Sequence, residues 1–206
     1  MGKTMFYVEK IMSDIIFPTS DLFARLQPIE KQIRRKSPSC WKKVANSLGE
    51  NWKRETANKA LLIKGARQVG KTTIVRQFAK TNYKNFIEIN FEQMPTAKQA
   101  FEGNLDARTI LINLSAMGFG PLEPGKTLIF FDEIQSCPKA RTAIKFLVED
   151  GQYDYIESGS LLGINYKDVS SYPVGFEHEL DMFPLDFEEF LWACNISEDV
   201  ISVLKD

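Results

Sequence analysis

The sequence predicts an α/β fold in which a mostly parallel sheet of about five strands lies between two layers of helices. From residue 59 onwards, short apolar runs alternate with stretches that have the apolar spacing of a helix. The run TLIFF at 127–131 has almost no polar residue, which is typical of a strand buried on both faces. Strands that alternate with helices pair in parallel, because each helix returns the chain to the same end of the sheet. These observations predict a three-layer α/β/α sandwich.

The expected elements follow one another along this part of the chain. Strands are expected at 60–64 (ALLIK), 85–91 (NFIEINF), 127–131, 153–158 (YDYIES) and 176–183 (FEHELDMF). Helices are expected at 71–82 (KTTIVRQFAKTN), 107–117 (ARTILINLSAM), 139–150 (KARTAIKFLVED) and 184–195 (PLDFEEFLWACN). The last helix begins at Pro184 and carries acidic residues in its first turn, which favour a helix N-terminus. A loop broken by Pro95 is expected after the second strand.

The main domain is expected to cover residues 58–195. Residues 1–57 precede it as an extension that is partly helical or disordered, because Pro18, Pro28 and Pro38 leave no room for long helices.

Composition narrows the classes of function. The net charge of −1 gives no overall attraction to nucleic acid or to an anionic membrane. A single histidine, His178, argues against most His-ligated metal sites and against Ser–His–Asp or Cys–His catalysis. Cys40, Cys137 and Cys194 are widely spaced and form no zinc pattern, so a reducing cytoplasm is the expected location. No apolar run approaches the ~20 residues of a membrane-spanning helix.

Two stretches match the phosphate-loop pattern G-x-x-x-x-G-K-[ST]: GARQVGKT at 65–72 and GPLEPGKT at 120–127. A phosphate loop needs a buried strand before it and a helix after it, whose first N–H groups bind phosphate. The first stretch has both neighbours, whereas the second contains Pro121 and Pro124, which lack N–H groups, and leads into a strand. We interpret the second as a connecting loop; the alternative for the first is a chance match in a βα turn. The expected nucleotide-binding residues are Gly65, Ala66, Arg67, Gln68, Val69, Gly70, Lys71, Thr72 and Thr73.

The run TLIFF is followed by Asp132 and Glu133, which supply the carboxylates that a phosphate loop needs. Asp132 would hold Mg²⁺ together with the hydroxyl of Thr72, and Lys71 would reach the β- and γ-phosphates. Glu133 would accept a proton from an attacking water or orient that water; the alternative is a surface acid at a strand exit. The Asp-Glu pair favours hydrolysis over phosphate transfer to a small molecule. These residues predict a P-loop NTPase.

An adjacent Asp-Glu pair marks the division of phosphate-loop proteins in which an extra strand lies between the loop strand and the carboxylate strand. By this analogy the strand at 153–158 is the inserted one, and its end faces the γ-phosphate. Ser158, in preference to Ser160, would sense or position the γ-phosphate or water, unless SGS is simply a turn. The guanine-reading N-K-x-D pattern is absent, so ATP is favoured over GTP.

Arg67, Arg76 and Arg141 are candidates for an arginine that stabilises charge on the nucleotide, and nothing in the sequence chooses among them. A surface charge is the favoured interpretation of Arg141. His178 lies in an acidic, strand-like run, so a structural role is favoured for it over a catalytic one.

The stretches LLIKGARQVGKTTIVRQFAK, IFFDEIQSCPKARTAIKFLVEDGQYDYIESGSLL and MFPLDFEEFLWA together resemble a large group of prokaryotic AAA-type ATPases. The resemblance covers residues 59–195. It implies an ATP-binding core in which 65–72 is the phosphate loop, Asp132 and Glu133 serve Mg²⁺ binding and hydrolysis, and 158–160 is a sensor-like turn. Members usually continue into a second C-terminal domain, so 196–206 is expected to be the stub of a missing or truncated domain. Many members carry Gly-Arg where this chain has Gly175-Phe176, so no arginine role is carried over.

The expected function is that of a cytoplasmic, Mg²⁺-dependent ATPase. It would bind ATP and couple hydrolysis to a conformational change in a protein partner or in its own missing C-terminal domain. One alternative is a non-hydrolysing nucleotide switch or scaffold that recruits a protein or DNA partner. A small-molecule kinase is less favoured, because the Asp-Glu pair argues against it. A basic segment at 31–59 gives weak support for a nucleic-acid partner, and no membrane partner is expected.

Overall fold

The computed structural model describes Trp52, residues 59–160, Pro173, residues 175–184, Asp186, residues 189–191, Ile196 and residues 198–203. The chain divides into two compact units, one formed by residues 39–189 and the other by residues 1–38 and 190–206. In the second unit the structure describes helix α8, Glu198–Val203. Of the extension at 1–57, which was expected to be partly helical or disordered, the structure describes Trp52, which is helical; the other residues of this range lie outside the described residues.

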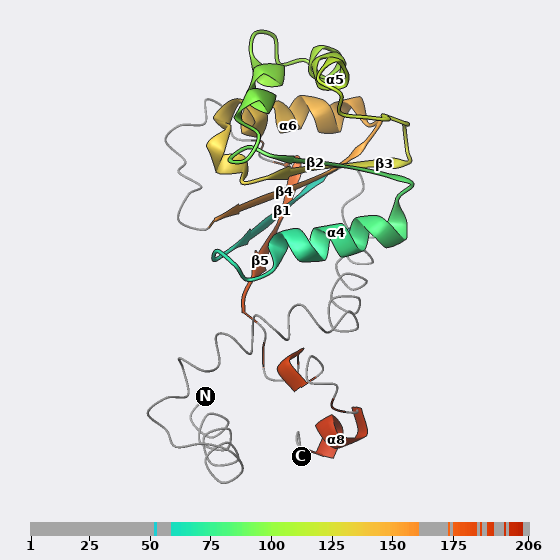
Figure 1. Cartoon of the computed structure of the whole chain (residues 1–206), viewed down its shortest axis with the longest axis vertical. Helices are drawn as coiled ribbons and strands as arrows, with labels where there is room; N and C mark the ends of the chain where they lie inside the picture. The colour runs from blue at the N-terminus through green and yellow to red at the C-terminus, as the bar shows by residue number, and fades with distance from the viewer. Residues whose placement is uncertain are drawn as a thin grey trace. The chain divides into compact units, whose positions relative to one another are not determined.

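Five strands form one parallel sheet in the order β2-β3-β4-β1-β5 (Figure 1). The strands are β1 Ala60–Gly65, β2 Asn85–Asn90, β3 Thr127–Asp132, β4 Asp154–Ser160 and β5 Glu177–Met182. Strand β4 lies between β1 and β3, which confirms the predicted insertion. Because all the pairs are parallel, the carboxyl ends of the strands share one edge of the sheet.

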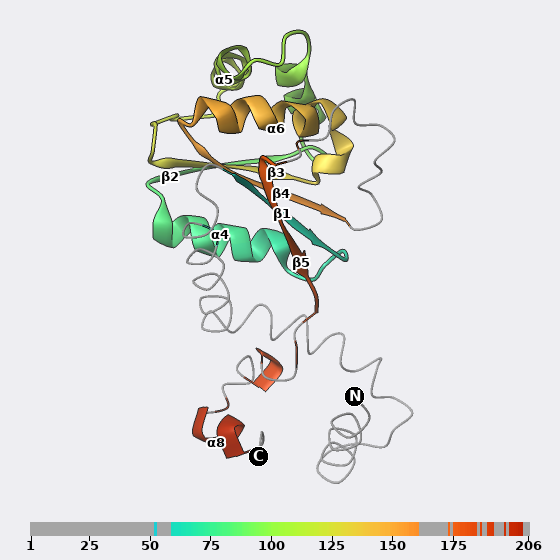
Figure 2. The same cartoon turned by 180° about the vertical axis from the view of Figure 1, so that it is seen from behind.

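Helices cover both faces of this sheet, which confirms the three-layer prediction (Figures 1 and 2). Helix α4, Lys71–Asn82, covers one face, and α6, Pro138–Asp150, covers the other. Helix α5, Ala107–Ala116, lies outside α6. The loop expected at Pro95 is instead a 3₁₀-helix, η1, Pro95–Phe101, which proline can begin because the first helical N–H needs no partner. A second 3₁₀-helix, η2, covers Ile134–Ser136.

The apolar character of β3 follows from its central position between the two helical layers. All of its residues are buried, and successive side chains point to opposite faces. Phe130 joins the cluster beneath α4 that contains Phe78, while Phe131 joins the cluster beneath α6, where its ring packs against Phe91 and Phe101. Burial on both faces explains why this strand was the clearest one in the sequence.

The helix expected from Pro184 is described in part. Residues 189–191 are helical, and Asp186 and Glu189 form a reciprocal cap. The backbone N–H of Asp186 donates to Glu189 Oε2 at 3.0 Å, and that of Glu189 donates to Asp186 Oδ1 at 2.8 Å. This capping arrangement explains why early acidic residues marked the start of the helix. Among the described residues, no helix combines the length and apolar character needed to cross a membrane.

Candidate nucleotide-binding site

The loop between β1 and α4 has the backbone shape of an open anion cradle. Gln68 and Gly70 both have positive φ angles, 66° and 103°, so the chain turns sharply before α4 begins at Lys71. Glycine adopts this conformation without strain at Gly70. No side chain caps the first turn of α4, so its N–H groups are available to a phosphate.

Gly65 ends β1 at a point where the neighbouring strand passes too closely for any side chain. A Cβ atom built on Gly65 would lie 2.4 Å from the backbone oxygen of Met182 in β5. The first glycine of the pattern is therefore required by packing between strands, in addition to any role in phosphate binding.

Lys71 is folded back into the loop. Its side chain is buried, and Nζ donates to the carbonyl oxygens of Gly65 at 2.9 Å and Ala66 at 2.8 Å. Burial lowers the pKa of Lys71, while the charges of Glu133 and Asp132 act in the opposite direction. A phosphate group would provide a stronger partner for this ammonium than the two carbonyls do.

Asp132, at the end of β3, accepts hydrogen bonds on both carboxylate oxygens. The Thr72 hydroxyl donates to Oδ2 at 3.1 Å, and the Ser158 hydroxyl donates to Oδ1. The structure thus brings together Thr72 and Asp132, the two residues expected to serve Mg²⁺. Hydroxyl and carboxylate oxygens are the hard ligands that Mg²⁺ prefers. The described residues contain no group of three or more His, Cys, Asp or Glu side chains placed to hold a metal ion.

Asn90, at the end of β2, is a third donor to Asp132 that sequence reasoning missed. Its Nδ2 donates to Asp132 Oδ2 at 2.9 Å, and its Oδ1 accepts the backbone N–H groups of Glu92 and Gln93 at 3.0 and 2.9 Å. Asn90 therefore fixes both the carboxylate and the turn that follows β2. The available signal was a polar residue at the end of an apolar strand, but its neighbour became known only with the strand order.

Glu133 follows β3 in the left-handed region, with φ 54° and ψ 49°, which is uncommon for a residue with a side chain. The carboxylate is partly exposed at the sheet edge and accepts a hydrogen bond from Gln135 Nε2. The structure thus places Glu133 next to Asp132, with Gln135 as its neighbour.

Ser158 is placed differently from the expectation. Strand β4 continues to Ser160, so SGS is not a turn, and Ser158 is a buried strand residue whose hydroxyl bonds to Asp132. Ser160 is the residue at the strand end, and it lies opposite Gly65 in the register of β4 and β1. The strand extends further than predicted because Gly159 and Ser160 pair with β1.

Arg141 is buried, so its interpretation as a surface charge is wrong. The side chain is 2% exposed and forms ion pairs with Glu157 at 2.8 Å and with Glu177. Burial, followed by the charge of Glu157, raises the pKa of Glu177 to about 9, and burial also raises that of Glu157. One buried cation therefore lies between two carboxyl groups, and we expect one of these to be protonated at neutral pH. His178 lies partly buried on β5, outside the cluster around Asp132.

The other two candidate arginines are exposed but differ in their contacts. Arg76 on α4 donates from Nε and Nη2 to the two oxygens of Glu88, at 2.7 and 2.6 Å. Arg67 lies in the phosphate loop, and its Nη2 makes a longer contact of 3.4 Å with Glu92. The Arg67 side chain is thus the less firmly held of the two.

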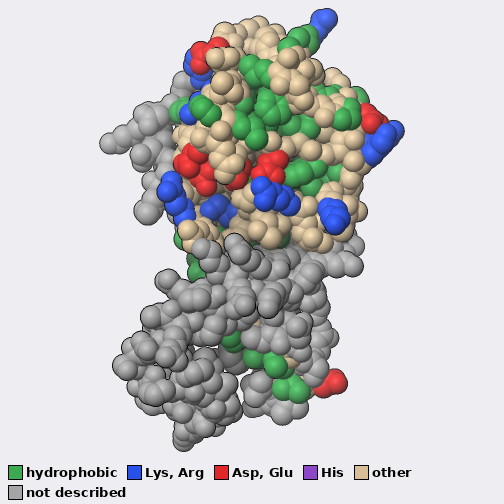
Figure 3. Space-filling view, in the orientation of Figure 1, with side chains coloured by type: hydrophobic (Ala, Val, Ile, Leu, Met, Phe, Trp, Pro, Cys, Tyr) green, Lys and Arg blue, Asp and Glu red, His purple; other side chains and the backbone are tan. Residues whose placement is uncertain are grey.

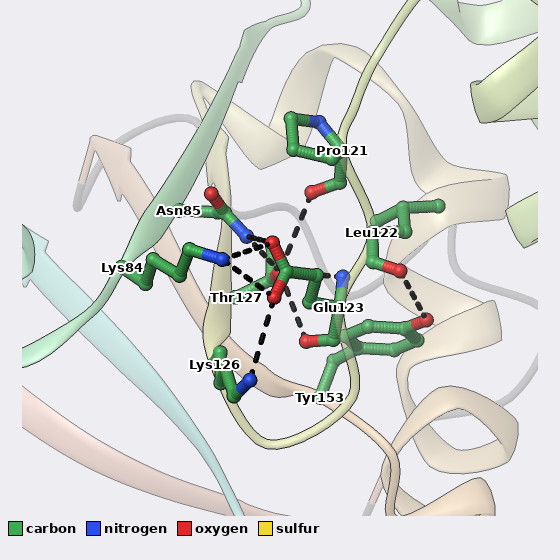
Figure 4. Close-up of polar contacts among 8 residues, drawn as sticks. All are labelled: Lys84, Asn85, Pro121, Leu122, Glu123, Lys126, Thr127 and Tyr153. Atoms are coloured by element: carbon green, nitrogen blue, oxygen red, sulfur yellow. Dashed lines mark hydrogen bonds and ion pairs between the residues drawn. The ribbon is translucent and has the colours of Figure 1, made fainter.

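The second pattern match, at 120–127, is a closed turn that precedes β3 (Figure 4). Its Thr127 hydroxyl accepts the N–H of Glu123 at 2.9 Å, and the Glu123 carboxylate binds Lys84 at 2.9 Å and Lys126 at 3.6 Å. The hydrogen bond from Lys84 is the main reason that the pKa of Glu123 falls to about 2. The lysine and threonine of this stretch therefore serve the turn itself, at the opposite end of β3 from Asp132. Its interpretation as a connecting loop is confirmed.

Comparison with known proteins identifies the family to which the chain belongs. A family model described as an AAA domain matches residues 57–191. No curated protein resembles the chain closely enough to count as a match. Among solved structures, the chain is similar to the Orc1 protein of Aeropyrum pernix, solved in complex with DNA, with 15% sequence identity and a TM-score of 0.44. That similarity covers 80% of this chain and 52% of the other, so the chain spans about half the length of this structural neighbour. Because the family model covers more than half of its 206 residues, the protein belongs to the AAA domain family of ATP-binding proteins.

Proposed function

We propose that the protein binds MgATP at the loop between β1 and α4 and hydrolyses it to ADP and phosphate. The observation that carries this proposal is the contact between Thr72 and Asp132, with Glu133 next in the chain and Lys71 buried in the adjoining loop. The phosphate loop, the two hard ligands Thr72 and Asp132, and the candidate base Glu133 therefore lie at one edge of the sheet. The same edge is the usual binding position in parallel α/β sheets.

Each residue of the cluster has a part in this reaction. Lys71 would leave the carbonyls of Gly65 and Ala66 and bind the β- and γ-phosphates. Thr72 and Asp132 would hold Mg²⁺, which neutralises charge on the phosphates. Glu133 would accept the proton of the water whose oxygen attacks the γ-phosphorus, as the bond to the ADP oxygen breaks.

The other polar residues would act through the carboxylate of Asp132 or, for Ser160, at the end of strand β4. Ser158 and Asn90 donate to this carboxylate and would keep it oriented, so the contribution of Ser158 is one of positioning. Ser160, opposite Gly65 at the end of β4, is the serine better placed to meet a terminal phosphate or water.

The test is phosphate release from ATP together with nucleotide affinity. Lys71→Ala should abolish both, and Glu133→Gln should retain ATP binding while losing turnover. Lys126→Ala is the matched control, because it removes the lysine of the second pattern match, which lies in the turn before β3 and pairs with Glu123. Wild-type rates in both Lys71→Ala and Glu133→Gln would sink the site assignment.

A non-hydrolysing nucleotide switch is the second candidate, and the contact between Gln135 and Glu133 favours it. A carboxylate that accepts a hydrogen bond from a neighbouring amide is less available to a water. This function predicts ATP binding without phosphate release in the wild type. Phosphate release that appears in Gln135→Ala would identify Gln135 as the residue that keeps the Glu133 carboxylate from the attacking water.

In either function the nucleotide would bias the conformation of a protein partner or of a further domain. A nucleic-acid partner has less support. On the face shown in Figure 3, Lys and Arg side chains of the described residues lie beside Asp and Glu side chains. Opposite charges also lie together in the ion pairs of Arg76 with Glu88 and of Lys84 with Glu123. Nucleic acid is usually bound by a continuous basic surface. The cytoplasm, where ATP is available, is the location that fits the proposal.

A further inference from the structure

The arginines of the described residues differ in the contacts that their side chains make. Four arginines lie among the described residues: Arg67, Arg76, Arg108 and Arg141. Arg141 is buried between two carboxyl groups, and Arg76 is bound through two nitrogens to Glu88. Arg108 lies on α5, in the outer layer. Arg67 alone of these four belongs to the phosphate loop.

Arg67 is an exposed residue of the proposed phosphate loop. It is the third residue of the pattern and directly precedes Gln68, where the loop turns with positive φ. The guanidinium charge acts on the buried ammonium of Lys71, since it is one of the causes that lower the pKa of Lys71. Arg67 and Lys71 are thus two cations that repel one another, and they belong to a loop whose N–H groups no side chain caps. This arrangement favours the binding of an anion.

Glu92 holds Arg67 only weakly. The contact is a single one of 3.4 Å, and the two side chains are 70% and 46% exposed. Exposed ion pairs of this kind contribute little to stability. A terminal phosphate carries more charge than a carboxylate and can bind an arginine through two oxygens, whereas Glu92 contacts Arg67 through one, so the phosphate competes well for the guanidinium.

Glu92 is itself connected to Asp132, the carboxylate proposed to hold Mg²⁺. Its backbone N–H donates to Asn90 Oδ1 at 3.0 Å, and the amide of Asn90 donates to Asp132. The contact between Arg67 and Glu92 therefore joins the phosphate loop to the turn after β2, across the ends of β4 and β3, the two strands that lie between β1 and β2. A change in the partner of Arg67 would release that turn from the phosphate loop.

We propose that Arg67 exchanges Glu92 for the terminal phosphate of ATP, and that this exchange makes the site distinguish a nucleoside triphosphate from a diphosphate. The proposal rests on the proposed function, because it needs a nucleotide in the loop. In the diphosphate-bound and nucleotide-free protein, Arg67 remains with Glu92. In the triphosphate-bound protein, the Glu92 turn is free to rearrange or to meet a partner.

Equilibrium binding of ATP and ADP to the purified full chain tests this exchange. Arg67→Gln should weaken ATP binding by about 10-fold or more, the loss expected for one charge-assisted hydrogen bond, and should change ADP binding by less than about twofold. Arg67→Lys should restore part of the ATP affinity, because it keeps the charge but not the two-point geometry. Glu92→Gln should strengthen ATP binding and leave ADP binding unchanged, because the competing carboxylate charge is removed.

Arg108→Gln is the matched control, because it removes an exposed arginine in the outer layer. Thermal unfolding of each variant checks that folding is retained, which is expected since both arginines are exposed. Equal weakening of ATP and ADP in Arg67→Gln, or no weakening of either, would overturn the exchange while leaving ATP binding at the loop intact. A wild-type protein that binds neither nucleotide would overturn the proposed function, and this inference with it.

Discussion

Replacing Arg141 with methionine tests the buried charge cluster that joins α6 to β4 and β5. Arg141 is 2% exposed, and its partners Glu157 and Glu177 are 0% and 5% exposed. Methionine fills part of the space but removes the only charge that opposes the two buried carboxyl groups in this cluster of described residues. Breaking a buried ion pair in this way costs about 3–5 kcal/mol. We expect Arg141→Met to lower the free energy of unfolding by that amount at about pH 7.5.

The pH dependence of this loss distinguishes charge from packing. Burial raises the pKa of Glu177 from 4.5 to about 9 and also raises that of Glu157. A raised pKa in the folded state stabilises the fold at pH values below 4.5, and this stabilisation is lost as pH rises towards 9. Without Arg141 the folded protein needs one more proton on the pair. The loss in the variant should therefore shrink by about 1.36 kcal/mol for each pH unit lowered, or about 2.7 kcal/mol between pH 7.5 and 5.5.

Urea unfolding followed by far-UV circular dichroism at three pH values in this range measures the loss. Arg108→Met is the control, because Arg108 is exposed on α5 and its replacement should change stability little at any of these pH values. Two results would refute the reasoning. One is a loss below about 1 kcal/mol at pH 7.5, and the other is a loss that stays the same across the range, which would point to packing alone.

Two further predictions concern the proposed site. Gly65→Ala places a Cβ 2.4 Å from the Met182 oxygen, so β1 and β5 must separate; we expect a loss of about 1–3 kcal/mol in urea unfolding together with weaker ATP binding. Gly120→Ala, where the nearest atom would lie at 3.8 Å, should be tolerated, and equal losses in the two variants would contradict the steric argument. Asn90→Ala removes a donor to Asp132 and should weaken Mg²⁺ affinity about 10–100-fold, measured by Mg²⁺ titration in the presence of a fluorescent ATP analogue. An unchanged Mg²⁺ titration would show that Asp132 needs no help from Asn90.

Much of the fold was predictable because its signals are local. Strand β3 has an uninterrupted apolar run, and α4 follows a glycine-rich turn at Gly70, so both elements were recognised from adjacent residues. The boundaries were less accurate. The end of β4 was placed at Ser158, because Gly159 and Ser160 have low strand propensity on their own. Pairing with β1 holds these residues in the strand, and that pairing depends on residues far away in the sequence.

In the candidate site, too, residues with local signals were predicted and residues with distant partners were not. Lys71, Thr72 and Asp132 were expected because their spacing and their neighbouring elements are visible along the chain. Asn90 was missed and Arg141 was misjudged, because their partners lie on other elements. Asn90 meets Asp132 across 42 positions of sequence, and Arg141 meets Glu177 across 36.

The sequence by itself determined the order of strands and helices, the phosphate-loop pattern at 65–72 and the carboxylate pair after β3. These features depend on residues within one strand, loop or helix, where apolar periodicity and backbone geometry act locally. The tertiary structure alone decided that Asp132 is held by Thr72, Asn90 and Ser158, and that the charge of Arg141 is buried. The physical reason is the strand order β2-β3-β4-β1-β5, which makes residues of different strands and helices neighbours although long segments separate them in the chain.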